Sequence, residues 1–446
     1  CYELDFSLAE AGDTFEAMAR ATIRNDTGDS WPYLLFRLYP ESPLLFGGDI
    51  EVEYVTVSGI AVEWERVLED ETGLQVPLST PLAPGGTVPV EIAFRGFLSD
   101  LSSDGAGGYG IFARARHSVT LASWFPLLAV WNEAADEWYN VPVLGQGDAV
   151  FTESALIEAT LSAPERYELA VSGLVVEQRA VDGQSIHRVV TGPARDLAMV
   201  WMEGYEREEL QVGDTTLRNW YRPGDEEGAA RALEAAREAL ALFNESFGPY
   251  PFEELDVVEA PLEGAGGVEY PQLYLLDEFL YRDENSHDFL AFASAHEMAH
   301  QWWYYVVGND INAAPWQDEA LTNWSAVFWM EQSAGETRAE EYLQSIELAV
   351  GRFEEERGKE AIAQPLARFV DRSDAYGTIV YLKGALFFAA LREEIGDDAF
   401  FDALQDYYAD NFFEITTPAG LLERFETTSG RALDEFYERW GVMAGN

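Results

Sequence analysis

The hydrophobic pattern of the chain changes near residue 221, and this change constrains the fold more than any other feature. Up to about residue 203, short runs of β-branched and aromatic residues alternate partly with polar ones and are separated by turn signals. The clearest runs are residues 33–39, 50–57, 88–94 and 155–161. Helical periodicity is missing there, so the sequence predicts a large antiparallel β domain over residues 1–203.

After residues 221–224 (Tyr-Arg-Pro-Gly), Ala, Glu and Leu recur at helical spacing. The first predicted helix covers residues 226–247 and stops at a Gly-Pro pair. Two strands are expected at residues 255–259 and 268–276, and further helices at 286–307, 318–333, 337–357, 376–394, 398–409 and 418–427. The prediction is therefore an α+β, multidomain chain whose second domain, residues 204–446, is mostly helical with a small sheet.

The charge of the chain excludes one class of partner. Its 446 residues carry 28 basic and 80 acidic side chains, a formal charge of −52, so no basic face is available for nucleic acid. Lys359 and Lys383 are the only lysines. Strong acidity with almost no lysine suggests a high-salt habitat, where salt screens the self-repulsion. A GC-rich genome, which favours Arg over Lys, is the alternative.

The single cysteine is residue 1, so disulfides are excluded. A cysteine at this position is what remains when a bacterial lipoprotein signal peptide is cleaved and the new terminus is lipidated. Since no run of 18 apolar residues exists, we expect an extracytoplasmic protein tethered to a membrane through lipidated Cys1 and not inserted in it. A chain trimmed at this point is the alternative.

Residues 296–300 read His-Glu-Met-Ala-His within an apolar stretch that lacks Pro and Gly. Four residues at 3.6 per turn bring His296 and His300 one above the other on a helix, where two imidazoles can share a metal ion. Glu297 is rotated by about 100° from His296, beside the metal without being a ligand, where a base acting on water should lie.

A catalytic zinc needs a third protein ligand and leaves the fourth position open. Glu319 is the candidate, because the 18 residues between it and His300 are enough to finish one helix, turn, and begin another. The set of two His and one Glu predicts one Zn²⁺ per chain. His117, His187 and His287 show no ligand spacing and are expected to be structural or solvated.

Several segments together resemble the zinc aminopeptidases of the aminopeptidase N family, which are gluzincins. Residues 296–303 (HEMAHQWW) and 316–319 (WQDE) carry the metal motif, 266–271 (GGVEYP) resembles the exopeptidase motif, and 381–385 (YLKGA) resembles the segment with the catalytic tyrosine. Residues 121–126 (LASWFP) resemble a signature of the N-terminal domain. Val268 and Tyr270 depart from the usual Met and Asn, and the Ala-Leu-Thr-Asn that follows Glu319 is atypical.

The resemblance implies a saddle-shaped β domain followed by a thermolysin-like zinc catalytic domain. It assigns the hydroxyl of Tyr381 to the oxyanion of the tetrahedral intermediate, with Tyr376 as a weaker rival. It assigns Glu269 to the free α-ammonium of a peptide, and the backbone of Gly266 and Gly267 to the wall of the substrate cleft.

Three functions are open at this point. The first is a zinc aminopeptidase that hydrolyses the N-terminal residue from peptides with a free N-terminus. The second is a zinc endopeptidase, for which Glu269 would not hold an amine. The third is a catalytically silent, peptide-binding protein of the cell surface, although such a protein has no use for Glu297 as a base.

Overall fold

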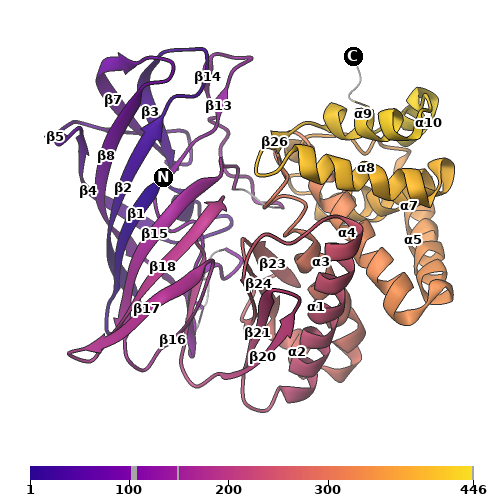
Figure 1. Cartoon of the computed structure of the whole chain (residues 1–446), viewed down its shortest axis with the longest axis horizontal. Helices are drawn as coiled ribbons and strands as arrows, with labels where there is room; N and C mark the ends of the chain where they lie inside the picture. The colour runs from indigo at the N-terminus through magenta and orange to yellow at the C-terminus, as the bar shows by residue number, and fades with distance from the viewer. Residues whose placement is uncertain (102–107, 148–149, 444–446) are drawn as a thin grey trace.

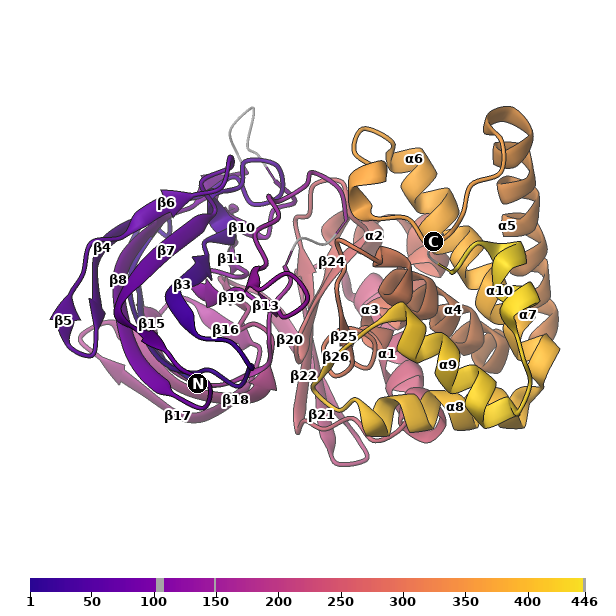
Figure 2. The same cartoon turned by 90° about the horizontal axis from the view of Figure 1, so that it is seen from above.

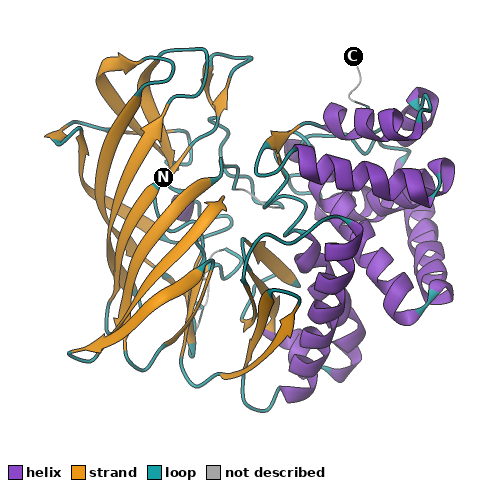
Figure 3. Cartoon of the chain, viewed as in Figure 1, coloured by secondary structure: helices purple, strands orange, loops and turns teal. Residues whose placement is uncertain are grey.

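The computed structural model describes residues 1–101, 108–147 and 150–443. Strands make up most of the N-terminal part, and helices make up most of the C-terminal part (Figure 1, Figure 3). The two parts lie side by side, and the β-then-α order predicted from the sequence is confirmed. Within the described ranges, no helix is long and apolar enough to cross a membrane.

The largest sheet of the described chain has eight strands in the order β17-β18-β15-β1-β2-β8-β4-β5. In that order the strands are Leu174–Val181, Gln184–Ala194, Ala155–Pro164, Tyr2–Leu8, Thr14–Arg24, Thr87–Phe97, Asp49–Val57 and Ile60–Ala61. Neighbours are antiparallel except β1 and β15, which are parallel. Every second side chain of β1 is buried, as expected for a sheet with one face on the core.

Two smaller sheets pack inside the curve of this one (Figure 2). The first has the order β16-β19-β11-β10-β9, with strands Glu168–Val171, Met199–Met202, Ser118–Leu121, Phe112–Arg114 and Ser99–Asp100. The second has the order β12-β3-β7-β6, with strands Leu127–Leu128, Trp31–Arg37, Gly73–Leu82 and Glu65–Val67. Aromatic side chains fill the space between the sheets, with Phe6, Phe15 and Trp124 in mutual ring contact.

The C-terminal part begins with a mixed sheet in the order β20-β21-β22-β24-β23. Its strands are Glu206–Val212, Thr215–Tyr221, Glu254–Ala260, Leu273–Asp277 and Gly267–Tyr270. Helix α1 (Glu226–Ser246) packs on α3 (His287–Ala299), and α3 contacts β23 and β24. Strand β23 lies at the edge of this sheet and pairs only with β24 among the described strands.

The remaining helices form a bundle on the far side of α3 (Figure 1). They are α4 (Pro315–Ala334), α5 (Glu336–Arg357), α6 (Ser373–Tyr376), α7 (Gly384–Ile395), α8 (Asp397–Asp410), α9 (Pro418–Ser429) and α10 (Asp434–Trp440). The short helix α2 (Glu278–Arg282) lies outside this bundle and packs against α1, α3 and the mixed sheet. A π-helical segment, Gly377–Lys383, joins α6 to α7. The short parallel pair of β25 (Gly308–Asn309) and β26 (Ile415–Thr416) ties the end of the α3 region to the α8–α9 loop.

Three predicted elements differ from the structure. The helix expected over residues 286–307 ends at Ala299, and the chain then turns, with Tyr304 at a φ of 108°. The strand expected over 268–276 is two antiparallel strands, β23 and β24, because Pro271 and Gln272 form a turn between them. The helix expected over 376–394 is α6, the π-helical segment and α7 in succession.

Candidate metal and peptide site

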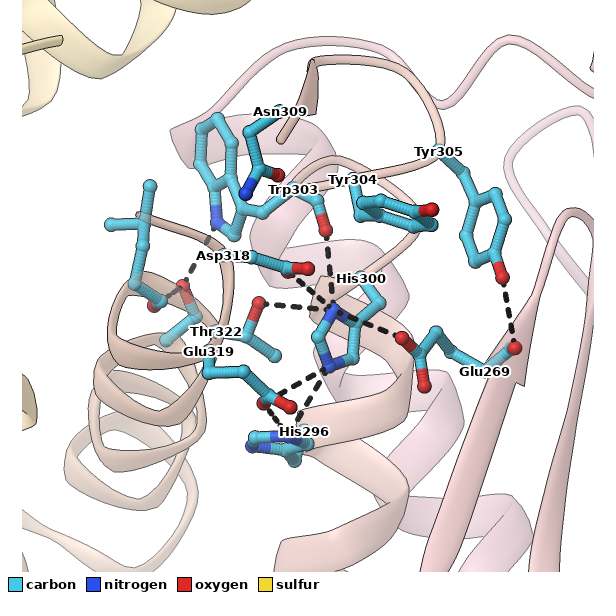
Figure 4. A network of polar contacts seen from close by, with 12 residues as sticks. Glu269, His296, His300, Trp303, Tyr304, Tyr305, Asn309, Asp318, Glu319 and Thr322 are labelled. Carbon is cyan, nitrogen blue, oxygen red and sulfur yellow. Dashed lines mark hydrogen bonds and ion pairs between the residues drawn. The ribbon is translucent and has the colours of Figure 1, made fainter. Parts of the chain in front are cut away.

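His296 lies in the last turn of α3 and His300 directly follows the end of the helix, on the side that faces α4. Both side chains are buried, and their Nε2 atoms lie 3.3 Å from each other (Figure 4). The helix is buried on nearly all sides because it passes between α1 and α4. The two imidazoles therefore have little freedom to turn away from each other.

Glu319, in the first turns of α4, completes a compact group of three ligand atoms. Its Oε2 lies 3.3 Å from Nε2 of His296 and 3.6 Å from Nε2 of His300 (Figure 4). Tetrahedral zinc with bonds of about 2.0–2.1 Å places its ligand atoms about 3.3–3.4 Å apart. This triangle therefore fits three corners of a zinc tetrahedron.

The charges of two of the three ligands, Glu319 and His296, suit a cation. Burial works against ionisation of Glu319, but the contacts with the two imidazoles lower the pKa of its carboxyl below the usual range. Burial also lowers the pKa of His296, so its ring stays neutral, as a metal ligand must be. Glu319 Oε2 is buried and accepts no hydrogen bond from the described chain, which leaves its lone pairs to a metal.

Three neighbours of Glu319 on α4 orient the histidines. Nδ1 of His300 lies 2.9 Å from Oδ1 of Asp318 and 3.4 Å from Oγ1 of Thr322, so Nε2 is turned toward Glu319 (Figure 4). Asn323 contacts His296 and donates to the carbonyl of Tyr381. Sequence reasoning missed all three residues, although positions three and four after Glu319 share its helix face.

Glu297 lies between the metal ligands and strand β23. Its carboxylate packs so closely on Gly267 that a Cβ there would lie 2.7 Å from both Cγ and Cδ of Glu297. One carboxylate oxygen each from Glu297 and Glu269 lies within 4.8 Å of a ring nitrogen of His300. The predicted base is therefore beside the metal ligands and outside the ligand triangle.

Glu269, on β23, approaches His300 from the side opposite Glu319 (Figure 4). Its Oε1 lies 3.8 Å from Nδ1 of His300, and the side chain is buried. Burial raises the pKa of Glu269 well above its usual range, and His300 opposes this rise. A cation beside this carboxylate would restore its ionised form.

Tyr381 reaches the ligand triangle from the π-helical segment. Its hydroxyl donates to Oε1 of Glu319, and its ring stacks on that of His296 with centroids 5.8 Å apart. Tyr376 lies against Tyr381, edge to face, at 5.4 Å between centroids. π-Helical segments are rare and are found mostly at functional sites, where they redirect single side chains.

All eight predicted site residues line one cavity of about 270 Å³. They are His296, Glu297, His300, Glu319, Tyr381, Glu269, Gly266 and Gly267. The N-terminal part adds Tyr109, Gln146 and Gly147 to its wall, and Phe289 adds an exposed ring. A larger cavity, of about 640 Å³, lies near Trp131 and holds none of the eight residues.

The remaining histidines lie elsewhere. Nε2 of His187 is 2.8 Å from Oγ of Ser185, and Nε2 of His287 is 3.1 Å from the carbonyl oxygen of Tyr281. Neither these two nor His117 belongs to a cluster of possible metal ligands within the part of the chain that the structure describes.

The fold of the whole chain is similar to that of solved structures. The whole chain superposes on the crystal structure of an M1 zinc metallopeptidase from Deinococcus radiodurans with a TM-score of 0.72, covering 94% of that chain at 18% identity. A mutant of that protein bound to a Tyr-Ser-Ala substrate gives a TM-score of 0.71. The chain thus has the fold of a two-domain zinc metallopeptidase.

Residues 231–440 match the family model described as "Peptidase family M1 domain". Aminopeptidase N of Streptomyces lividans is 24% identical over 58% of the chain and 30% of its own length. The mitochondrial aminopeptidase 2 of Saccharomyces cerevisiae is 22% identical over 88% of the chain and 41% of its own length. The chain spans about a quarter to two fifths of the curated relatives that it matches.

Proposed function

We propose that the protein is a zinc-dependent aminopeptidase that hydrolyses the N-terminal residue from peptides. The observation that carries this proposal is the place of Glu269, a buried carboxylate in the same cavity as the ligand triangle and Glu297. A substrate with a free α-ammonium supplies a cation that this carboxylate can bind. The similarity to aminopeptidase N of Streptomyces lividans and to aminopeptidase 2 of Saccharomyces cerevisiae supports the same activity.

The metal ligands, Glu297 and Tyr381 each have a separate role in the hydrolysis. Zinc, when bound by His296, His300 and Glu319, supplies a Lewis acid that polarises the scissile carbonyl. Glu297 takes a proton from the attacking water and later passes it to the leaving amine. The hydroxyl of Tyr381, already beside the ligand Glu319, donates to the oxygen on which negative charge develops.

The position of Glu269 sets which bond is cleaved. A charge-assisted hydrogen bond holds the α-ammonium about 3 Å from the carboxylate, and the first carbonyl carbon is only two covalent bonds further. Because Glu269 also lies 3.8 Å from a metal-binding histidine, the first peptide bond is the one placed over the ligand triangle. An internal bond of a long peptide has no adjacent free α-ammonium that Glu269 could bind.

Glu269→Ala tests this assignment. On substrates with a free amine we expect a loss of about 2 to 4 kcal/mol of transition-state stabilisation, the range for breaking a desolvated charge pair. Zinc content should stay unchanged because Glu269 is outside the ligand triangle. Glu254→Ala, in strand β22 of the same sheet and outside the cavity, is the matched control.

The assay compares amino-acid amide reporters with and without an acetylated amine, together with zinc content. The parent enzyme should cleave the free amines and leave the acetylated forms nearly intact. Equal cleavage of both forms, or first cleavage at internal bonds of a long peptide, would establish an endopeptidase instead. Full zinc content without hydrolysis of any reporter would support a peptide-binding protein.

The place of the protein in the cell stays a prediction. Cys1 is an exposed free thiol in the structure, accessible to modification. We propose that it carries the lipid of a membrane-anchored, extracytoplasmic lipoprotein. Mass spectrometry of the N-terminal peptide, taken from membranes of cells that express the full gene, tests this; an unmodified or absent Cys1 contradicts it.

A further inference from the structure

We infer that Gln301 and Tyr305 are positioning residues that fix the distance between the metal site and Glu269, and so confine cleavage to the first peptide bond. The inference rests on the proposed aminopeptidase function. Both residues belong to the turn that follows His300, and both reach across to the strand that carries Glu269. The side-chain hydrogen bonds of both residues go to residues 269–272 and not to the ligand triangle.

Gln301 uses both ends of its amide on the turn after β23. Its Nε2 donates to the carbonyl of Tyr270 at 2.9 Å, and its Oε1 accepts from the backbone N–H of Gln272 at 2.8 Å. The side chain is 1% exposed, so these bonds are shielded from water. Gln272 has a φ of 61°, a conformation that needs such support.

Tyr305 holds the next carbonyl along the same strand. Its hydroxyl donates to the carbonyl of Glu269 at 2.9 Å (Figure 4), while its own N–H donates to the carbonyl of His300 at 3.1 Å. Burial raises the pKa of Tyr305 well above the usual range, which keeps the hydroxyl protonated as a donor. One residue therefore joins the backbone of a metal ligand to the backbone of Glu269.

These contacts replace support that the sheet does not provide. Strand β23 has four residues, lies at the sheet edge, and pairs only with β24 among the described strands. The carbonyls of its last two residues, Glu269 and Tyr270, also accept hydrogen bonds from Tyr305 and Gln301. Without these bonds, β23 could shift relative to α3, and a shift of about 1 Å is enough to misplace a bound substrate.

The N-terminal part of the chain secures the turn itself. Tyr304, at a φ of 108°, has its carbonyl bound by Nε of Arg195 at 2.9 Å. Arg195 is buried and also donates to the carbonyls of Thr152 and Glu414 at 2.8 and 2.9 Å. A backbone strained in this way persists only where its surroundings over-determine it, and such strain is concentrated at functional sites.

Tyr305→Phe tests the inference, because it removes one donor and leaves the ring in place. We expect kcat/KM on free-amine reporters to fall about threefold to tenfold, the effect of one lost hydrogen bond, while residual cleavage of acetylated reporters and zinc content stay unchanged. Tyr437→Phe is the matched control, since its buried hydroxyl also donates to a backbone carbonyl, that of Leu422 at 2.9 Å, in the distant helix α9.

Gln301→Met is the second variant, and it should lower the preference for free amines further and allow release of dipeptides from a long peptide. An equal loss on free and acetylated reporters in Tyr305→Phe, or the parent's preference in both variants, overturns the positioning role. The parent enzyme tests the function separately. If it does not prefer free amines, the aminopeptidase proposal itself fails; if it does and the variants keep that preference, only the present inference fails.

Discussion

The substitution Gly267→Ala tests whether the close packing of strand β23 on Glu297, the predicted base, is needed for activity. Gly267 lies outside the left-handed region, so an alanine can adopt its backbone conformation without strain. The added Cβ, however, would lie 2.7 Å from Cγ and Cδ of Glu297, and carbon atoms in contact prefer about 3.5–4.0 Å. The side chain of Glu297 must therefore move by about 1 Å.

The expected decrease in kcat follows from that displacement. A shift of about 1 Å in a catalytic group costs on the order of 100-fold in rate, so kcat should fall by about that factor. Zinc content should stay at one ion per chain, because the clash does not reach the ligand triangle. Gly266→Ala is the matched control: its Cβ would meet the exposed ring of Phe289 at 3.1 Å and Cδ1 of Leu280 at an ordinary contact distance of 3.8 Å, and activity should change less than about threefold.

The assay measures kcat on free-amine reporters in the parent, both glycine variants, Glu297→Gln, and Glu297→Gln combined with Gly267→Ala. Glu297→Gln should bind zinc and lose nearly all hydrolysis, since an amide cannot take the proton. If Gly267→Ala acts only through Glu297, it should cost almost nothing further in the Gln background. A full additional 100-fold loss there, or parent-like activity of Gly267→Ala alone, would refute the reasoning.

Three further predictions concern metal binding and stability. Asp318→Ala should weaken zinc binding about 10- to 100-fold in a chelator competition, because it removes the partner of His300 Nδ1; unchanged affinity contradicts this. Burial raises the pKa of Asp256 from 3.8 to about 6, so the native state holds a proton that the unfolded chain releases, and stability should fall as the pH rises from about 4 to 6. Asp256→Asn should remove this fall, about 3 kcal/mol, from the pH profile of unfolding; parallel profiles would show that Asp256 ionises normally. The thermal midpoint should rise between about 0.1 M and 2 M NaCl as salt screens the charge of −52, whereas a flat response favours genome composition as the cause of the acidity.

The sequence was most informative where periodicity is strong. Helix α5 was expected over residues 337–357 and covers Glu336–Arg357, and α8 was expected over 398–409 and covers Asp397–Asp410. Glycines at positive φ, Gly335 and Gly396, precede these helices and mark their starts. In the β part, the run expected at residues 155–161 is the first part of β15.

The end of α3 could not be predicted in the same way. Residues 302–307 are aromatic or β-branched and residues 301–307 lack Gly and Pro, so no local signal ends the helix. The chain turns there because of contacts made far away in the sequence, such as Arg195 with the carbonyl of Tyr304. The turn between β23 and β24, in contrast, had a local signal, because Pro271 lies in the middle of the expected strand.

The ligand triangle was accessible to sequence reasoning because helix geometry alone relates His296 to His300. The residues that orient it were not, because Asp318 and Gln301 look like ordinary polar residues beside a motif. Their roles depend on which neighbouring element packs against them. Only the folded chain brings Asp318 to His300, and Gln301 to the carbonyl of Tyr270.

The two oxygens of Glu319 have different tasks, and this explains how Tyr381 comes to lie beside the metal site. Oε2 faces the two imidazoles, while Oε1 accepts the hydroxyl of Tyr381. The approach depends on Gly384, just after the π-helical segment, since a Cβ there would overlap with Ala320, the neighbour of Glu319. Close packing of α7 on α4 thus brings Tyr381, the proposed oxyanion donor, to Glu319, and a larger residue at position 384 would separate the two.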